Sequence, residues 1–222
     1  MLWSDLIIIT FFLVQTGIGL LGNSILLLLY VGIVTSHPGQ KKPADLILSH
    51  LTVANTVMLL TQSVPGMVVA FGMNNILDDA GCLIVIYIRR VARGLSISTT
   101  CLLSTFQAIT ISPSTSLWAK LRPRVPNCII PSFLFFWALN LLIYLNILKD
   151  IAVMKNTTLL INGYSMKLCP NTVRVHLSGH IAFISIPYFR DLFFVFLMSW
   201  ASGYMIITLH QHRKKVQHVH IC

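Results

Sequence analysis

The sequence predicts an all-α membrane protein in which a bundle of helices crosses the bilayer. Of its 222 residues, 55% are hydrophobic and only 10% are charged, whereas soluble domains carry about 25% charged residues. Five stretches contain no Asp, Glu, Lys or Arg: 6–34, 46–77, 94–117, 125–148 and 192–209. Each is close to the roughly 20 residues that a helix needs to cross the hydrocarbon core. A helix satisfies its own backbone groups there, which lipid cannot do.

We therefore predict a single transmembrane domain over residues 1–222. With the flanking turns, its helices are expected at about 6–34, 46–72, 82–112, 125–148 and 190–210. The first helix also serves as the insertion signal, because no Lys or Arg precedes it and its apolar run is longer than that of a cleavable signal peptide.

Polar side chains within the predicted helices indicate how the helices associate. Six of them are expected to form interhelical hydrogen bonds in preference to ligand contacts: Asn23, His50, Asn55, Gln62, Asn140 and Asn146. The third helix adds a run of small hydroxyl residues: Ser96, Ser98, Thr99, Thr100, Ser104 and Thr105. Because such residues let helices approach closely, we expect the third helix to lie at the centre of the bundle.

The third helix also carries Arg89, Arg90 and Arg93 within the predicted span. At 100° per residue they lie on one face, in an arc of about 100°, and Arg93 lies roughly 16 Å along the helix from Cys82. An arginine at membrane depth is costly and normally faces the bundle interior or water.

Three roles are open for these arginines. They could extend to lipid head groups, pair with Asp78, Asp79 or Asp191 for structure alone, or line a water-accessible cavity at the outer side. We favour the cavity, in which the arginines and nearby Ser96 would bind an anionic or strongly polar ligand.

Lysines and arginines in the short connections predict the orientation, because these residues accumulate on the cytoplasmic side. The first and third connections and the tail contain Lys41, Lys42, Lys120, Arg122, Arg124, Arg213, Lys214 and Lys215. The second connection, 72–81, contains two Asp and no basic residue. We therefore expect the N-terminus outside and the tail in the cytoplasm. The long fourth connection, about 149–189, is also basic, but long external loops weigh little in this rule.

Two features of this fourth connection agree with an external position. Asn156-Thr157-Thr158 is an N-glycosylation sequon. Cys169 lies in the same connection and Cys82 at the outer start of the third helix, so both would face an oxidising compartment. A disulfide between them is therefore permitted, and two free thiols are the alternative.

Several function classes find no support in the sequence. The net charge of +10 does not indicate nucleic-acid binding, because the basic residues lie in short connections between spans. The chain has no GxxxxGKS, HExxH, CxxC or GxSxG motif and no pair of carboxylates within the spans. We therefore expect neither an enzyme nor a bound cofactor or metal.

A set of short segments spread over the whole chain forms a specific pattern. These segments are Gly22–Ser24, Leu51–Asn55, Cys82–Ser96, Thr100–Pro113, Trp118–Arg124, Trp137, Asn156, Cys169 and Arg190–Leu192. The pattern resembles the vomeronasal type 1 receptors, a family of pheromone-receptor G-protein-coupled receptors. Asn55 and Phe106-Gln107-Ala108 depart from the wider rhodopsin-like superfamily, where an Asp and an acidic-Arg-aromatic triplet are common, but both departures are usual in this family.

The resemblance implies a rhodopsin-like bundle at the plasma membrane, with five of seven expected helices present. It implies that the protein binds a small pheromone or odorant outside and activates a heterotrimeric G protein inside. The candidate G-protein contacts are Gln107, Lys120, Arg122, Arg124, Arg213, Lys214 and Lys215, with anchoring to the membrane surface as the alternative role. Two other functions stay open: a non-signalling truncated receptor or pseudogene product, and an anion transporter or channel subunit.

Overall fold

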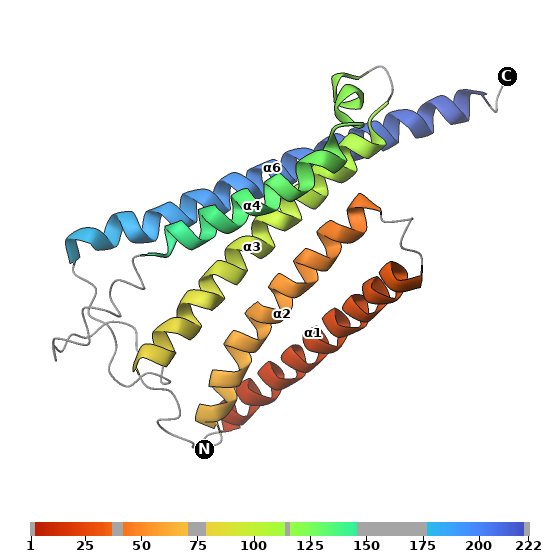
Figure 1. Ribbon diagram of the computed structural model, residues 1–222. Helices are drawn as coiled ribbons and strands as arrows, with labels where there is room; N and C mark the ends of the chain where they lie inside the picture. Colours follow the sequence, from red (N-terminus) through yellow and green to blue (C-terminus); the bar gives the residue numbers. More distant parts are fainter. Residues whose placement is uncertain (1–2, 37–41, 71–78, 114–115, 146–176, 220–222) are drawn as a thin grey trace.

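The computed structural model describes residues 3–36, 42–70, 79–113, 116–145 and 177–219. Five long helices and one short 3₁₀ helix make up this part of the chain (Figure 1). They are α1 (Trp3–Ser36), α2 (Pro43–Ala70), α3 (Asp79–Ile111), η1 (Leu117–Leu121), α4 (Val125–Ile143) and α6 (Leu177–Val219). The predicted all-α class is therefore confirmed.

Each of the five α-helices contains a segment that is long and apolar enough to cross a membrane. These segments are Leu13–Ile33, Pro43–Ser63, Ile84–Ile111, Val125–Ile143 and Ser185–Lys214. The predicted five spans are confirmed within the described residues. Helix α6 extends beyond the expected 190–210 at both ends, because a helix ends where its backbone hydrogen bonds end, whereas hydropathy reports only the apolar run.

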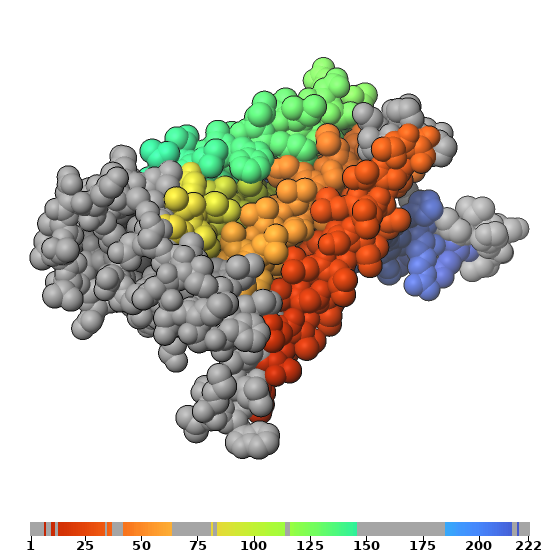
Figure 2. Space-filling model, turned by 60° about the horizontal axis from the view of Figure 1, so that its bottom comes forward, coloured from red at the N-terminus to blue at the C-terminus, as the bar shows by residue number. Residues whose placement is uncertain are grey.

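Helix α3 lies at the centre of the bundle, as its small hydroxyl residues predict. It packs against α2, α4 and α6, whereas α1 packs mainly against α2. Figure 2 shows α1 and α2 beside each other across one face of the molecule. Of the residues in the α3 span, 39% are buried, compared with 6% in the α1 span. Ser98 and Thr99, two of the hydroxyl residues of α3, are fully buried.

Large apolar side chains cover the outside of this bundle. Phe11 on α1, Leu134 on α4 and Phe189 on α6 are among the most exposed. In a membrane such side chains lie against lipid tails, which are as apolar as they are. Helix association then depends on close packing and on hydrogen bonds between helices.

One such set of hydrogen bonds joins α2, α3 and α4 at His50. Trp137 Nε1 of α4 donates to His50 Nε2 at 3.0 Å, and His50 Nδ1 lies 3.0 Å from Thr99 Oγ1 of α3. The indole N–H can only donate, so His50 Nε2 is the acceptor. The neutral imidazole therefore carries its hydrogen on Nδ1, and this N–H donates a hydrogen bond to Thr99 Oγ1. The imidazole also stacks on Phe133, with 4.2 Å between ring centroids. One side chain therefore aligns three helices.

Two more of the expected interhelical bonds are present, whereas Asn23 and Gln62 form none within the described residues. Ser96 Oγ of α3 donates to Asn55 Oδ1 of α2 at 2.6 Å, and Asn140 of α4 binds a side chain of α6. Asn23, in contrast, donates to the carbonyl of Gly19 in its own helix at 2.8 Å. Its helix, α1, lies at the edge of the bundle, so this amide is satisfied locally. Asn146 lies outside the described residues.

Trp137→Phe tests the three-helix junction, because it removes the indole N–H and keeps a large ring. We expect the free energy of unfolding to fall by about 0.5–1 kcal/mol, since His50 Nε2 loses its donor. Thermal unfolding of the purified protein in detergent micelles measures the effect. Trp200→Phe is the control, because that indole side chain on α6 is 66% exposed. Equal losses from both substitutions would contradict a role for the hydrogen bond.

Candidate functional site

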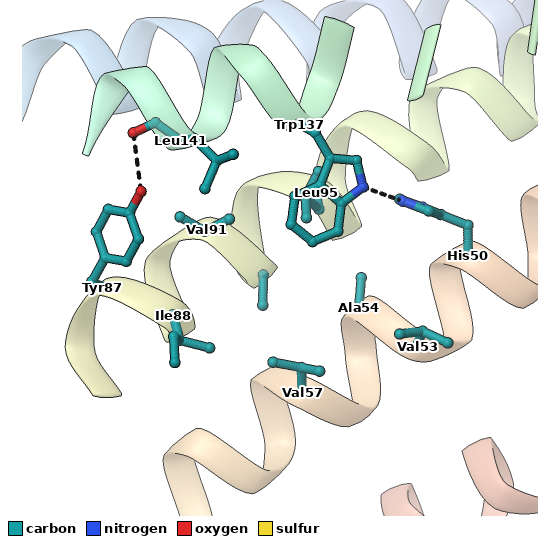
Figure 3. Close-up of a pocket in the computed structure, with 11 residues that line it drawn as sticks. His50, Val53, Ala54, Val57, Tyr87, Ile88, Val91, Leu95, Trp137 and Leu141 are labelled. Atoms are coloured by element: carbon teal, nitrogen blue, oxygen red, sulfur yellow. Dashed lines mark hydrogen bonds between the residues drawn. The ribbon is translucent and has the colours of Figure 1, made fainter. Parts of the chain in front are cut away.

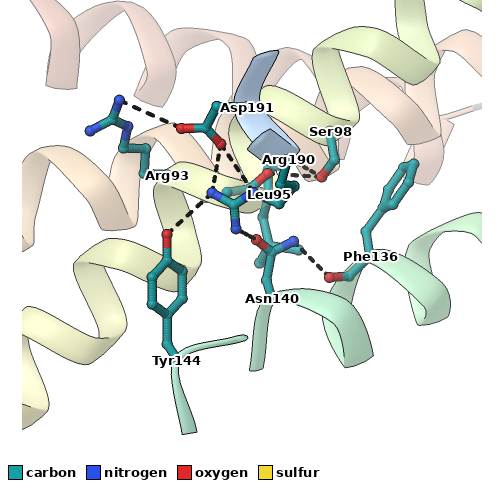
Figure 4. Close-up of polar contacts among 9 residues, drawn as sticks. Arg93, Leu95, Ser98, Phe136, Asn140, Tyr144, Arg190 and Asp191 are labelled. Carbon is teal, nitrogen blue, oxygen red and sulfur yellow. Dashed lines mark hydrogen bonds and ion pairs between the residues drawn. The ribbon is translucent and has the colours of Figure 1, made fainter. Parts of the chain in front are cut away.

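Charged side chains gather where the first half of α3 meets α4 and α6 (Figure 4). The three arginines expected from the sequence lie on α3, within the membrane-spanning segment Ile84–Ile111. The structure adds Arg190 and Asp191, which are consecutive residues of α6. This group is the most strongly charged region within the described parts of the membrane spans.

Arg190 is the buried member of the group, with a side chain only 5% exposed. Its Nη1 donates to Asn140 Oδ1 at 2.5 Å, and its Nη2 donates to Tyr144 Oη at 3.2 Å, both in or just after α4. Its Nε and Nη2 both donate to Asp191 Oδ1, at 3.0 and 2.7 Å. We call these four residues the Arg190 network. A buried charge is stable only when it is paired and hydrogen-bonded, and Arg190 satisfies both conditions.

Gly94 of α3 provides the space that the Arg190 network needs. A Cβ atom at this position would overlap Asn140 Oδ1 and would lie only 2.6 Å from Arg190 Nη1. Asn140 cannot easily move aside, because it is fully buried and its Nδ2 donates to the Phe136 carbonyl at 2.7 Å. Only glycine lets α3 approach α4 and α6 this closely.

The three predicted arginines differ in their surroundings. The Arg93 side chain is 63% exposed, and its Nη2 lies 3.7 Å from Asp191 Oδ2, which is longer than a hydrogen bond. Arg90 is exposed, and its guanidinium carbon lies 5.9 Å from the centroid of the Tyr144 ring, within range of a cation–π interaction. Arg89 is half-buried. Arg93 thus has the pairing with Asp191 that was one open alternative, but most of its side chain stays exposed.

Ser96, the fourth predicted ligand contact, contacts a different helix from the one that Arg93 contacts. Its hydroxyl donates to Asn55 of α2, whereas Arg93 faces Asp191 of α6. Conversely, sequence reasoning did not include Arg190, Asn140, Tyr144 or Gly94 in the site. The available signal was an Arg-Asp pair at the start of a span together with an asparagine inside another span, but nothing in the sequence joins residues 50 positions apart.

An apolar cavity of about 280 Å³ lies on another side of α3, between α2 and α4 (Figure 3). Its walls include Ala54 and Val57 of α2, Val91 of α3 and Leu141 of α4. Trp137 lies at its edge, where the indole binds His50. The exposed lining of this cavity is apolar, so the cavity suits an apolar group.

At the other end of α3, Arg122 closes the helix. Its Nη2 donates to the carbonyls of Thr110 and Ser112 at 2.8 and 2.7 Å, and the last carbonyls of a helix have no partner within it. Ser112 Oγ also lies 2.7 Å from Tyr204 Oη of α6. Arg122 is therefore held by α3, although the sequence placed it among the candidate G-protein contacts.

The remaining predicted residues are either exposed or outside the description. Like Arg122, the other described candidates for G-protein contact are exposed: Gln107, Lys120, Arg124, Arg213 and Lys214. Cys169 and Asn156 lie outside the described residues, and the side chains of Cys82 and Lys215 are not described either. The disulfide and the glycosylation site therefore stay predictions.

Comparison with known proteins gives one consistent family. The model of the vomeronasal organ pheromone receptor family matches residues 6–222. Vomeronasal type-1 receptor 1 of Homo sapiens is 38% identical over 211 residues, covering 94% of this chain and 58% of that protein. Olfactory receptor class A-like protein 1 of Danio rerio is 35% identical over 209 residues, covering 94% of this chain and 66% of that protein. The chain thus spans about three-fifths to two-thirds of the length of these curated relatives.

Gly94→Ala tests whether the close approach at the Arg190 network holds the bundle together. We expect the added methyl group to displace Asn140 and to lower the free energy of unfolding by about 1–3 kcal/mol. The yield of monodisperse protein and its melting temperature in detergent report the loss. Gly22→Ala and Gly203→Ala are matched controls, because nothing lies within 4 Å of a Cβ at either position. If Gly94→Ala behaves like these controls, the close packing is not required.

Arg122→Ala tests the closure of α3. The last turn of α3 should fray, at a cost of about 1 kcal/mol, because two carbonyls lose a charged donor. Hydrogen–deuterium exchange of a peptide covering 106–113 should become faster. Arg124→Ala serves as the control, since the Arg124 side chain makes no capping bond to α4. Unchanged exchange in the Arg122 variant would show that the contact does not stabilise the helix end.

Proposed function

Since the chain belongs to the vomeronasal organ pheromone receptor family, we propose that it acts as a pheromone receptor for small anionic ligands. The ligand binds at the charged region of α3 and α6 from outside the cell, and a heterotrimeric G protein binds at the opposite, cytoplasmic end. Ligand binding favours the active arrangement of the helices by binding it more tightly than the inactive one.

The exposed side chain of Arg93 is the observation that carries this proposal. It lies in a membrane-spanning segment, is 63% exposed, and forms an ion pair with Asp191 at 3.7 Å. An arginine at such depth is retained where it faces water or the interior of the bundle and serves a function. Its N–H groups are arranged to bind a carboxylate, sulfate or phosphate through two parallel hydrogen bonds.

The charge balance supports an anionic ligand. Within the described residues, Arg93 and Arg190 share the one carboxylate of Asp191. The region lies in surroundings of lower dielectric constant than water, where attraction of an anion is stronger. A steroid sulfate, with one sulfate group on an apolar body, has the right chemistry for such a site.

The cytoplasmic contacts are proposed from exposure and charge. Lys120 and Arg124 follow α3, and Arg213 and Lys214 lie near the end of α6, all of them exposed. Gln107 is exposed on α3 itself. We assign these residues to the G-protein surface, and Arg122 to holding the connection that presents Lys120 and Arg124.

Arg93→Ala should weaken the response to steroid sulfates and spare the response to uncharged steroids. Loss of a charge-assisted hydrogen bond of about 1.5–3 kcal/mol corresponds to a rise of roughly ten- to a hundredfold in the half-maximal concentration. A G-protein reporter assay in cells measures it, using a panel of steroid sulfates, each with its unsulfated parent, and surface labelling to normalise for expression. Arg93→Lys is the control, because it keeps the positive charge. A sulfate response that survives Arg93→Ala unchanged rules out the proposed site.

A further inference from the structure

We propose that Asp191 is a specificity-determining residue that acts as a built-in competitor of the ligand. Its carboxylate lies beside the Arg93 guanidinium until an anionic ligand displaces it. Asp191 therefore sets how tightly an anion must bind Arg93 in order to replace the carboxylate. The proposal rests on the proposed function of Arg93 and adds a second residue to the same site.

The two oxygens of Asp191 are bound unequally. Oδ1 accepts two hydrogen bonds from Arg190, at 3.0 and 2.7 Å. Oδ2 only approaches Arg93, at 3.7 Å, without a hydrogen bond. One oxygen thus belongs to the Arg190 network, and the other can lose its partner without breaking that network (Figure 4).

Exposure gives the order in which an incoming anion meets these groups. The Arg190 side chain is 5% exposed, that of Asp191 is 18% exposed and that of Arg93 is 63% exposed. An anion therefore reaches Arg93 first and Arg190 last. Arg190 keeps Asn140, Tyr144 and Asp191 as partners throughout, so no buried charge is left unpaired when the ligand binds.

The exchange at Arg93 favours the ligand on geometric grounds. An exposed ion pair without a hydrogen bond is weak, whereas a sulfate or carboxylate can approach the guanidinium through two hydrogen bonds. Asp191 meanwhile repels every anion that approaches without displacing it. A single neutral acceptor would gain little in this exchange, and the carboxylate would therefore select for charged, multidentate groups.

The exchange also has a consequence for the helices. Arg93 belongs to α3, and Asp191 belongs to α6, so their contact joins two helices that pack along much of their length. At the other end of α3 the same two helices are joined by Ser112 and Tyr204. Loss of the Arg93–Asp191 contact removes one polar link between α3 and α6 near the ligand, while Gly94 stays packed against the Arg190 network.

Asp191→Asn tests the competitor directly, because Asn has the same shape and its Oδ1 still accepts from Arg190. We expect the half-maximal concentration of steroid sulfates to fall by about two- to fivefold relative to that of their unsulfated parents, the range that corresponds to loss of an exposed ion pair. A change shared by sulfates and parents reports the loss of the carboxylate beside Arg190, and only the difference between them reports competition at Arg93. The measurement is the same reporter assay, normalised for surface expression.

The double variant Arg93→Gln with Asp191→Asn shows where the effect arises. If Asp191 competes for Arg93, the gain from Asp191→Asn disappears when Arg93 is replaced. If Arg93→Gln weakens the sulfate response while Asp191→Asn leaves it unchanged or weakens it, Asp191 does not compete with the ligand. The proposed ligand site at Arg93 then still stands. If Arg93→Gln alone leaves the sulfate response unchanged, the proposed function itself is wrong.

Asp191→Glu keeps the proposal testable if the Asn variant fails to reach the cell surface. The longer side chain keeps the negative charge and brings it closer to Arg93. We expect sulfates to become about two- to fivefold less potent relative to their parent steroids. Equal changes for sulfates and parents would mean that Asp191 serves only the fold.

Discussion

The buried guanidinium of Arg190 is the constraint on which the rest of the charged region of α3, α4 and α6 depends. A cation that is only 5% exposed inside a membrane-spanning bundle must be paired and hydrogen-bonded on every side. Asn140 and Tyr144 of the α4 segment and Asp191 of α6 meet that need. Gly94 of α3 leaves the room for them. Three helices are thereby held at one distance, and Arg93 is left uncovered on the open side of the same group.

The same physical logic applies along the whole of α3. Because apolar burial drives helix association only weakly in lipid, polar contacts and small residues decide which helices adjoin. His50 joins α2 to α3 and α4 through Thr99 and Trp137, and Ser112 joins α3 to α6 through Tyr204. Many large apolar side chains lie on the outside. The interior of the bundle is mixed: these polar contacts accompany an apolar cluster that includes Leu95, Phe136 and Phe194.

The candidate site was only partly predictable. Arg93 stands out in the sequence because a charge interrupts an apolar span, and that signal is local. Arg190 carries the same charge at the edge of its span, but its burial depends on Asn140, which is 50 positions away. For Arg122, the sequence predicts a functional contact and the structure shows a structural one. Composition places it with the other basic residues of its connection, whereas the structure binds it to the end of α3.

The sequence by itself determined the helical class, the five spans, the central position of α3 and the family, because hydropathy, residue size and motif are properties of short segments. Tertiary structure alone decided which arginine is buried and which is exposed, that Ser96 faces Asn55 of α2, and that Asn23 is satisfied within α1. These outcomes depend on how each helix is rotated and how closely it approaches its neighbours. Rotation and approach are set by contacts between residues far apart in the chain, and such contacts exist only after the helices have packed.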